Sequence, residues 1–427
     1  MRGFILTALL AVTGPLALEE CISLARSSDR TLRQREITVS ESRSKAALSV
    51  LDWIPEISVG AGNDFNWGRS VDMQELLIVD NRMTVTSSFS ASASLSLTKG
   101  YCNLLRRSSG KAEEKMAGFS LEQAAAELDA AVTEAFFQVL LCRQAGEIAE
   151  RNCIEIEAEL RSAAVEAESG SKAKADLYEL EAQVCRERAA LAEARNKLKL
   201  AGMTLNDYLN LPPEEEIELL PPTGDSVPAP LMNRNMIEER AERSPSAGMA
   251  EAKLEMDRLE LRLAKAAFLP SLTVAGGCGT YYSSTGGGGF MDQISGNVNP
   301  SAGVALSIPI LGGSGNARAL AAAKAELARQ ELETEKVRRE SVAAIREGVA
   351  VAADLYENYL AAEAGLKAAG KVEGIAHERH SAGEIPGSEY LAARNRRLRA
   401  EAGLLQARYR YLLQLKLLEC RYGLKAY

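Results

Sequence analysis

Residues 84–98 read TVTSSFSASASLSLT, an almost strict alternation of apolar and hydroxyl-bearing side chains. A period of two places the two sets on opposite faces of a β-strand. One predicted face is apolar and the other is polar without charge, as in a strand that lies between lipid and a water-filled lumen. The stretch also exceeds the ~10 residues that a tilted strand needs to cross a bilayer. A half-buried sheet of a soluble domain is the alternative, although such strands usually carry charge on their wet face.

Three further stretches predict companion strands. Residues 302–310 alternate in the same way, and residues 57–61 and 272–276 begin two more apolar series. Four strands cannot close a barrel, and lipid does not tolerate open strand edges. The chain is therefore expected to oligomerise, and three copies would supply twelve strands, an even number within the range of known barrels.

The chain is an internal repeat, which a search for self-similarity reveals. Residues 53–59 (WIPEISV) resemble residues 268–274 (FLPSLTV), so that Pro55 and Pro270, the predicted strand-start prolines, stand 215 residues apart. Later matches keep nearly the same spacing: 95–98 with 306–309, Asn103 with Asn316, 111–113 with 324–326, and 180–183 with 391–394. Each half predicts a helix, a proline-started strand, a loop, a second strand, a very long helix, a glycine-containing turn and a long helix.

The repeat and the prolines divide the chain into four parts. Residues 1–17 resemble a signal peptide, because Arg2 precedes the apolar run 4–12 and small residues follow; a buried first helix is the alternative. Residues 18–210 form the first repeat and residues 231–427 the second. Six of the 13 prolines fall in the connector, residues 211–230. The residues before Cys21 are not the small ones expected before a lipidated cysteine, so no lipid anchor is predicted.

Heptad spacing predicts helices packed along a seam. Leucine or valine recurs every seven residues in both halves: Leu177, Val184, Leu191, Leu198 and Leu205, then Leu391, Leu398, Leu405 and Leu412. The stretch from Asn316 to His380 lacks proline and would extend roughly 95 Å as a helix. Turns are expected near Gly170 and Gly383, which gives two long antiparallel hairpins.

The composition excludes several classes of function. The net charge of −8 and the absence of a basic block argue against a nucleic-acid partner. The seven cysteines show no paired or ligand-like spacing. The two histidines, His377 and His380, make an incomplete metal site and are expected at a solvated helix end. No phosphate loop, zinc-protease motif or nucleophile elbow appears, so neither an enzyme nor a cofactor is predicted.

These features together resemble the TolC-like outer-membrane efflux protein family. The resemblance rests on the tandem repeat, the proline strand starts, the run SIPILGG at 307–313 and the run EYLAARN at 389–395. It implies an α+β membrane protein, a homotrimer whose four strands per chain form a 12-stranded barrel in the outer-membrane lipid and whose hairpins form a 12-helix periplasmic barrel. The connector would lie in the equatorial region. The hairpin tips, at Gly170, Gly383 and Gly387, would meet a periplasmic adaptor (a membrane fusion protein) coupled to an inner-membrane pump.

The resemblance also suggests a gate. Family members can carry acidic rings at the tunnel entrance, and Glu389 falls on the first of those acidic positions, whereas the second falls on Ala392. The alternative is that Glu389 is a solvated acid favoured by the helix dipole.

Three functions follow as hypotheses. The first is a passive exit duct of a tripartite efflux system for small molecules. The second is the outer-membrane duct of a type I protein secretion system, and the third is a periplasmic coiled-coil scaffold without a pore.

Overall fold

The computed structural model describes residues 14–71, 78–97, 99–168, 174–222, 227–229, 234–309 and 313–424. The chain divides into two compact units, and each unit draws on both halves of the sequence. The helical unit comprises Met1–Glu36, Phe119–Gly248 and Lys336–Tyr427, and the strand unit comprises Ile37–Gly118 and Met249–Glu335.

The two halves of the chain present the same order of elements. The first half contains α1 (Leu18–Ser28), α2 (Arg30–Leu48), a 3-10 turn (Leu51–Trp53), β1 (Glu56–Val71), β2 (Ile78–Ser96), α3 (Lys99–Glu168) and α4 (Lys174–Leu209). The second half contains α5 (Arg234–Glu242), α6 (Pro245–Ala266), β3 (Ser271–Ser283), α7 (Phe290–Gly296), β4 (Asn299–Ser307), α8 (Gly313–Ser381) and α9 (Gly387–Tyr422). The chain is mostly helical with a small sheet, which is consistent with the predicted α+β class.

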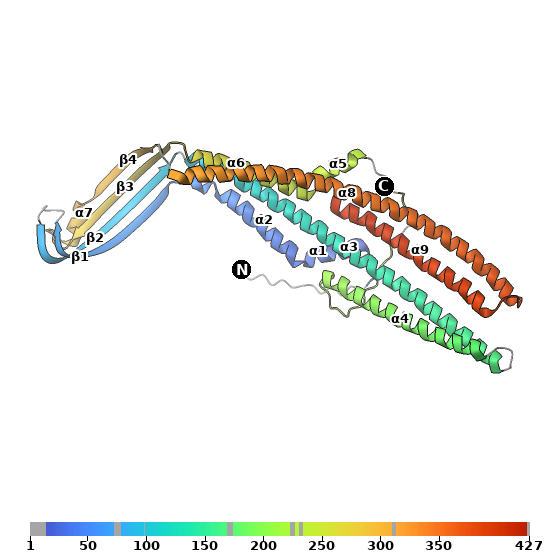
Figure 1. The fold of residues 1–427 in the computed structure, drawn as a ribbon. Coiled ribbons are helices and arrows are strands. Elements are labelled where there is room, and N and C mark those ends of the chain that lie inside the picture. The colour runs from blue at the N-terminus through green and yellow to red at the C-terminus, as the bar shows by residue number, and fades with distance from the viewer. Residues whose placement is uncertain are drawn as a thin grey trace. The chain divides into compact units, whose positions relative to one another are not determined.

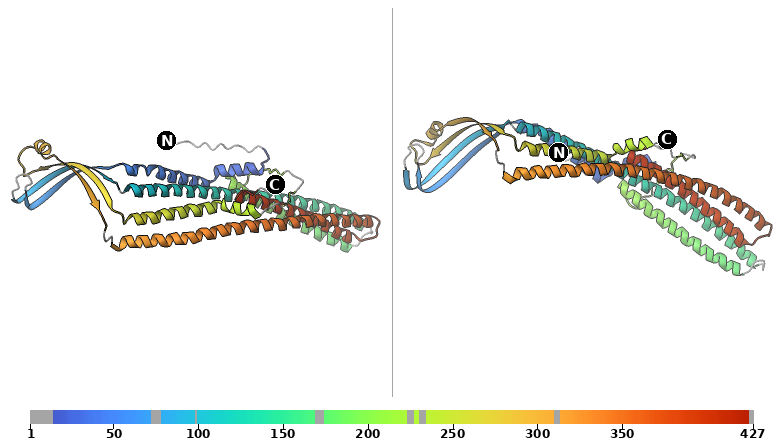
Figure 2. Two further views of the ribbon diagram at one scale, coloured as in Figure 1. Left: turned by 90° about the horizontal axis from the view of Figure 1, so that it is seen from above. Right: turned by 45° about the horizontal axis from the view of Figure 1, so that its top comes forward.

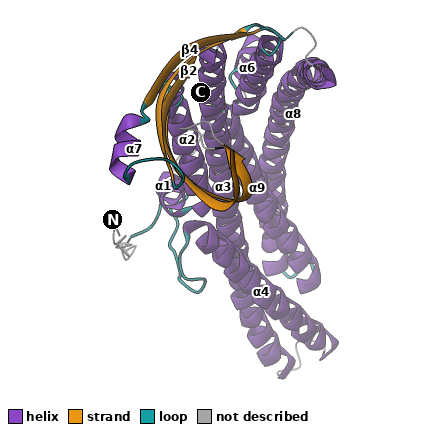
Figure 3. Cartoon of the chain, turned by 90° about the vertical axis from the view of Figure 1, so that its left-hand side faces the viewer, coloured by secondary structure: helices purple, strands orange, loops and turns teal. Residues whose placement is uncertain are grey.

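The four strands of the strand unit form one antiparallel sheet in the order β1-β2-β3-β4 (Figure 1). The register sets Val59 opposite Ala91, Ala91 opposite Cys278, and Val274 opposite Val304. This register keeps most of the larger apolar residues of the four strands on one face, as the alternation within residues 84–98 predicts for β2. The strands curve along their length, and α7 lies beside them (Figure 3).

Each half begins with two short consecutive helices, α1 and α2 or α5 and α6, and a capping residue marks the start of the second helix of each pair. Asp29 Oδ1 accepts a hydrogen bond from the Leu32 amide at 2.6 Å, which caps the start of α2. In the second half Ser244 Oγ accepts from the Ala247 amide at 3.3 Å, and Pro245 is the first residue of α6. Proline suits that position because its missing amide hydrogen has no helical partner there.

Two helical hairpins, α3 with α4 and α8 with α9, form most of the helical unit (Figures 1 and 2). One apolar core joins α1, α3, α4 and α9, and its largest fully buried side chains include Phe136, Phe137, Leu140 and Leu205. A second core joins α5, α8 and α9 around Tyr411 and Ile345. Heptad residues Leu180, Val184 and Leu398 are also buried, so the coiled-coil prediction is confirmed.

The helix α7 was not expected, because the glycine-rich residues before it predicted only a loop. The Gln293 side chain is buried and bonds the backbone of Ser283, the last residue of β3, as a neighbouring strand would. Its Oε1 accepts from the Ser283 amide at 2.9 Å, and its Nε2 donates to the Ser283 carbonyl at 3.1 Å. Phe290 packs against Tyr282, with ring centroids 5.1 Å apart.

Several sequence predictions fall on residues outside the described ranges. They are Gly170, Thr98, residues 223–226 and Pro230 of the predicted connector, residues 310–312 of the SIPILGG run and residues 1–13 of the predicted signal peptide. Leu16, within that predicted signal, forms an isolated parallel bridge with Leu219. Within the described ranges, no helix combines the length and the apolar character needed to cross a bilayer.

Candidate functional site

One face of the sheet is apolar and exposed. Val59 is 81% exposed, Val304 69% and Leu306 62%, although a soluble chain would bury such side chains. The face comprises Ile57, Val59, Ala61, Phe65, Trp67, Val85, Phe89, Ala91, Ala93, Leu95, Leu272, Val274, Cys278, Ala302, Val304 and Leu306. Phe65 and Trp67 stack at one end of β1 with ring centroids 6.4 Å apart. The extent of this face fits contact with lipid.

The opposite face, termed the hydroxyl face, consists of small side chains without charge over most of its length. Its members are Ser58, Gly60, Gly62, Ser88, Ser90, Ser92, Ser94, Ser96, Thr273, Ala275, Gly277, Gly279, Ser301, Gly303, Ala305 and Ser307. Ser58 and Ser92 hydrogen-bond through their hydroxyls at 2.8 Å. A Cβ added at Gly277 would lie 3.0 Å from the Ala91 carbonyl oxygen, so this face requires glycine where strands approach closely.

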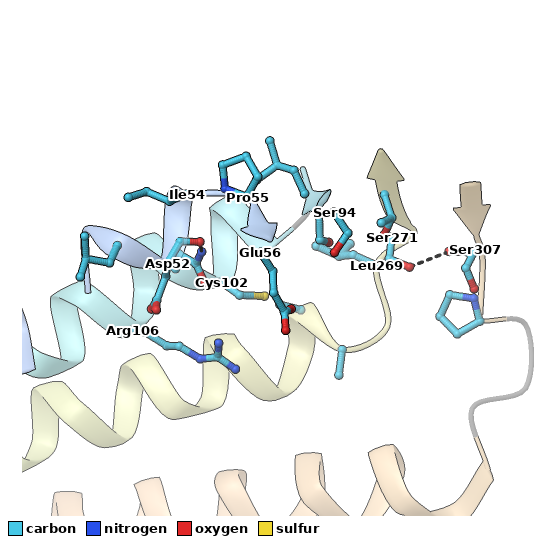
Figure 4. Close-up of a pocket in the computed structure, with 18 residues that line it drawn as sticks. Asp52, Ile54, Pro55, Glu56, Ser94, Cys102, Arg106, Leu269, Ser271 and Ser307 are labelled. Atoms are coloured by element: carbon cyan, nitrogen blue, oxygen red, sulfur yellow. Dashed lines mark hydrogen bonds between the residues drawn. The ribbon is translucent and has the colours of Figure 1, made fainter. Parts of the chain in front are cut away.

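A cavity of about 910 Å³, termed the junction cavity, lies where the strands meet the helices of the strand unit (Figure 4). Ser94, Ser96 and Thr273 of the hydroxyl face line it. The lining also includes Asp52, Glu56 and Arg106, and Figure 4 shows the Glu56 and Arg106 side chains extending into the same space. Charge therefore appears where the uncharged hydroxyl face ends.

The predicted strand-start prolines lie beside this cavity. Pro55 directly precedes β1 and Pro270 directly precedes β3. Asn103 Nδ2 donates to the Asp52 carbonyl at 2.7 Å, and its repeat counterpart Asn316 donates to the Ala267 carbonyl at 3.4 Å. These paired hydrogen bonds anchor each long helix to the segment just before the strand.

The α8/α9 turn spans residues 382–386. Gly383 adopts φ +76°, a left-handed conformation that favours glycine. Gly387 is the first residue of α9, and Glu389 is an exposed acid in its first turn. This position is electrostatically favourable for a carboxylate, because the helix N-terminus is partially positive.

The two histidines, which lie at the end of α8, pack against a tyrosine at the start of α9. His380 stacks on Tyr390 with centroids 5.5 Å apart, and His377 lies 5.5 Å from the same ring at an angle of 50°. Ile385, Ala376 and Ala393 form the small apolar cluster beneath. The sequence marked the histidines only as a helix end, because their shared contact lies across the turn.

An ion-pair network joins the two hairpins near their ends. Arg394 of α9 pairs with Glu155 of α3 and lies 4.0 Å from Glu159. Leu391 packs against the α3/α4 cluster of Ile156 and Leu180. Burial lowers the pKa of Arg394, whose side chain is only 13% exposed, but an arginine remains charged at physiological pH. Sequence analysis missed this network, since nothing in the local pattern predicts which helices meet.

Another cavity, of about 410 Å³, lies in the helical unit and is rich in arginine. Arg26 there pairs with Asp129 through an Nε–Oδ1 contact of 2.7 Å, and Arg421 pairs with Glu134 at 3.7 Å. These pairs serve packing between helices.

The structure describes all seven cysteines as free thiols. Cys21 is fully buried in the core around α1, and this burial raises its pKa to about 12. No group of three or more histidine, cysteine, aspartate or glutamate side chains within the described ranges is placed to hold a metal ion.

Comparison with known proteins gives a consistent picture. The family model "Outer membrane efflux protein" matches residues 21–211 and 236–419. The pyoverdine export outer membrane protein OpmQ of Pseudomonas putida is 22% identical over 263 residues, which span 60% of this chain and 55% of OpmQ.

Solved structures share the fold at low sequence identity. CusC superposes with a TM-score of 0.81 at 17% identity, covering 94% of this chain and 91% of that one. The outer membrane protein VceC of Vibrio cholerae gives a TM-score of 0.80 at 15% identity, with 96% and 97% coverage.

Proposed function

Because the chain belongs to the outer membrane efflux protein family, we propose that it is the exit duct of a tripartite efflux system, which passively conducts small molecules out of the cell. The chain is an outer-membrane protein and is not an enzyme, since its family consists of efflux channels. The energy for transport comes from a pump in the inner membrane.

The two-faced sheet is the observation that carries this proposal. Its apolar face suits lipid and its hydroxyl face suits a watery lumen. The strands β1 and β4 stand at the two ends of the strand order, so each has one edge unpaired within the chain. Edges of this kind require partners in lipid. Three chains then close a 12-stranded barrel, and their helical hairpins close a 12-helix barrel in the periplasm.

Small molecules are the favoured cargo. The relative OpmQ is named for the export of pyoverdine, which supports efflux of small molecules over the secretion of proteins. A type I secretion duct is the alternative within the same fold. A coiled-coil scaffold without a pore leaves the exposed apolar face unexplained.

The hairpin ends are the proposed docking points for the adaptor, around Gly383 and Gly387 on one hairpin and Gly170 on the other. Glu389 is the proposed gate acid. Threefold symmetry would bring three carboxylates together at the entrance, which would attract cations and repel anions.

The membrane assignment is tested with adjacent residues on opposite faces. Val59→Arg places a charge on the apolar face, where it costs about 2–4 kcal/mol near the bilayer midplane. Ser58→Arg is the matched control on the hydroxyl face. We expect Val59→Arg to reduce assembled protein in outer-membrane fractions strongly and Ser58→Arg to reduce it little. Equal recovery of the two variants would contradict the proposal.

The gate is tested by single-channel recording in planar bilayers. Glu389→Gln should lower the preference for cations over anions. Glu384→Gln is the control, because Glu384 is an exposed acid of the neighbouring α8/α9 turn that pairs with Arg379 at 3.3 Å. An unchanged reversal potential in Glu389→Gln would reject the gate role.

A further inference from the structure

The junction cavity concentrates charge next to an uncharged stretch of the hydroxyl face. From Ser58 to Gly62, and along the strand segments paired with them, the hydroxyl face carries only uncharged side chains, namely serine and glycine together with Tyr281 and Asn299. The junction cavity lies at the end of that face where β1 begins, and its lining includes Asp52, Glu56 and Arg106. The other charged position on this face of β1, Asp64, lies beyond Gly62. Asp52, Glu56 and Arg106 are therefore separated from it by the uncharged stretch, at the end of the face where the strands meet the helices.

Glu56 and Arg106 form no ion pair that stabilises the described part of the chain. Both are exposed, and neither forms an ion pair with any residue of the described ranges, although both line the same cavity. Exposed charged groups without an internal partner remain free to act on a passing ion.

The internal repeat shows that the fold does not need these charges. The hydrogen bonds of Asn103 to Asp52 and of Asn316 to Ala267 establish the structural correspondence. By the same alignment, Ser271 stands where Glu56 does and Ala319 stands where Arg106 does. At these two corresponding positions the second repeat thus forms its strand start and its long helix with uncharged residues.

We propose that Asp52, Glu56 and Arg106 form a charge-selective ring inside the duct, separate from the hairpin tip, that contacts small charged solutes. The inference rests on the proposed channel function. Two carboxylates and one guanidinium per chain leave a formal charge of −1, which favours cations. The guanidinium also supplies a contact for anionic groups, so the ring suits small solutes that carry both signs of charge.

The test measures the K⁺/Cl⁻ permeability ratio of the full-length protein in planar bilayers under a KCl gradient. Glu56→Ser and Arg106→Ala install the residues that the second repeat uses. They change the formal charge of the ring to 0 and −2 per chain, and the double variant restores −1. We expect cation preference in the order Arg106→Ala, then wild type and double variant together, then Glu56→Ser. A change of at least about twofold per step is expected at low salt, because each substitution alters three charges in the trimer and a single unit charge ~8 Å from the ion already gives about that factor.

A relocated charge provides the matched control. Ser271 lines the same cavity, so Glu56→Ser combined with Ser271→Glu should restore the wild-type ratio. Variants that conduct with unchanged permeability ratios would overturn the ring and leave the channel function intact. A wild-type protein that forms no conducting channel would instead overturn the channel function, and the ring with it.

Discussion

The imidazole of His380 lies parallel to the phenol ring of Tyr390, with centroids 5.5 Å apart and an interplanar angle of 4°. Its Nδ1 also donates a hydrogen bond to the Ile385 carbonyl at 3.0 Å. The His380 side chain of α8 therefore contacts both the α8/α9 connection, through Ile385, and the start of helix α9, through Tyr390.

His380→Ala should loosen this turn. The variant loses one hydrogen bond and one stacked ring pair, together worth about 1–2 kcal/mol. Amide hydrogen exchange across residues 382–386 should accelerate roughly tenfold. His377→Ala is the control, since His377 meets Tyr390 only obliquely, and equal exchange rates in the two variants would contradict this assignment.

Arg394→Ala should weaken the contact between the two hairpins. The change removes the cation that pairs with Glu155 and lies 4.0 Å from Glu159. Because the position is partly buried, we expect a loss of about 1–2 kcal/mol. The loss would appear as a lower Tm in detergent. Arg188→Ala removes an exposed pair with Glu157 (2.8 Å) and should leave Tm nearly unchanged, because solvent screens exposed ion pairs. Recovery of Tm when Arg394→Glu is combined with Glu155→Arg would verify the pairing, and no recovery would argue against it.

Gly348→Ala should destabilise the helical unit. A Cβ at Gly348 would lie 2.7 Å from Cδ2 of Leu418, a buried side chain in the α8/α9 core that has little room to move. Overpacking costs about 1–3 kcal/mol, which exceeds the gain of up to ~1 kcal/mol from replacing a helical glycine. Gly365→Ala, on the same helix with open space around it, should be stabilising. Opposite shifts in the free energy of unfolding are expected, and shifts of the same sign would show that Leu418 yields easily.

Cys21 should resist alkylation in the folded protein, whereas the exposed Cys185 reacts. Burial, followed by the charge of Glu20, raises the pKa of Cys21 from 9.0 to about 12. Below pH 9 both folded and unfolded chains hold the proton. As the pH rises from 9 toward 12 only the unfolded chain releases it, so this contribution to stability is lost. Cys21→Ala should flatten the decline of stability over that pH range, and rapid labelling of Cys21 at pH 8 would contradict its burial.

The sequence predicted those features that depend on short-range periodicity. Alternation within residues 84–98 gave the two faces of β2, and heptads gave the helical hairpins. The family assignment, drawn from the repeat and its motifs, is also confirmed. Contacts between helices that are distant in sequence could not be predicted. Arg394 and Glu155 lie far apart in sequence, and whether they pair depends on how each helix is rotated about its axis. The junction charges were overlooked for a similar reason, because Asp52, Glu56 and Arg106 come from different elements. The short helix α7 has too few residues to show a period.

The register of β2 with β3 has a consequence for biogenesis. The strands β2 and β3 are neighbours in the sheet, with Ser90 opposite Gly279. In the order of synthesis, however, the whole α3/α4 hairpin lies between them. Closing such a long loop is slow compared with forming local helices. During translocation β1 and β2 emerge well before β3, and the waiting edge of β2 can pair wrongly with other chains. The topology therefore leaves the first β-hairpin with an unpaired edge until the second half has been exported, and that edge is where a periplasmic chaperone would protect the chain.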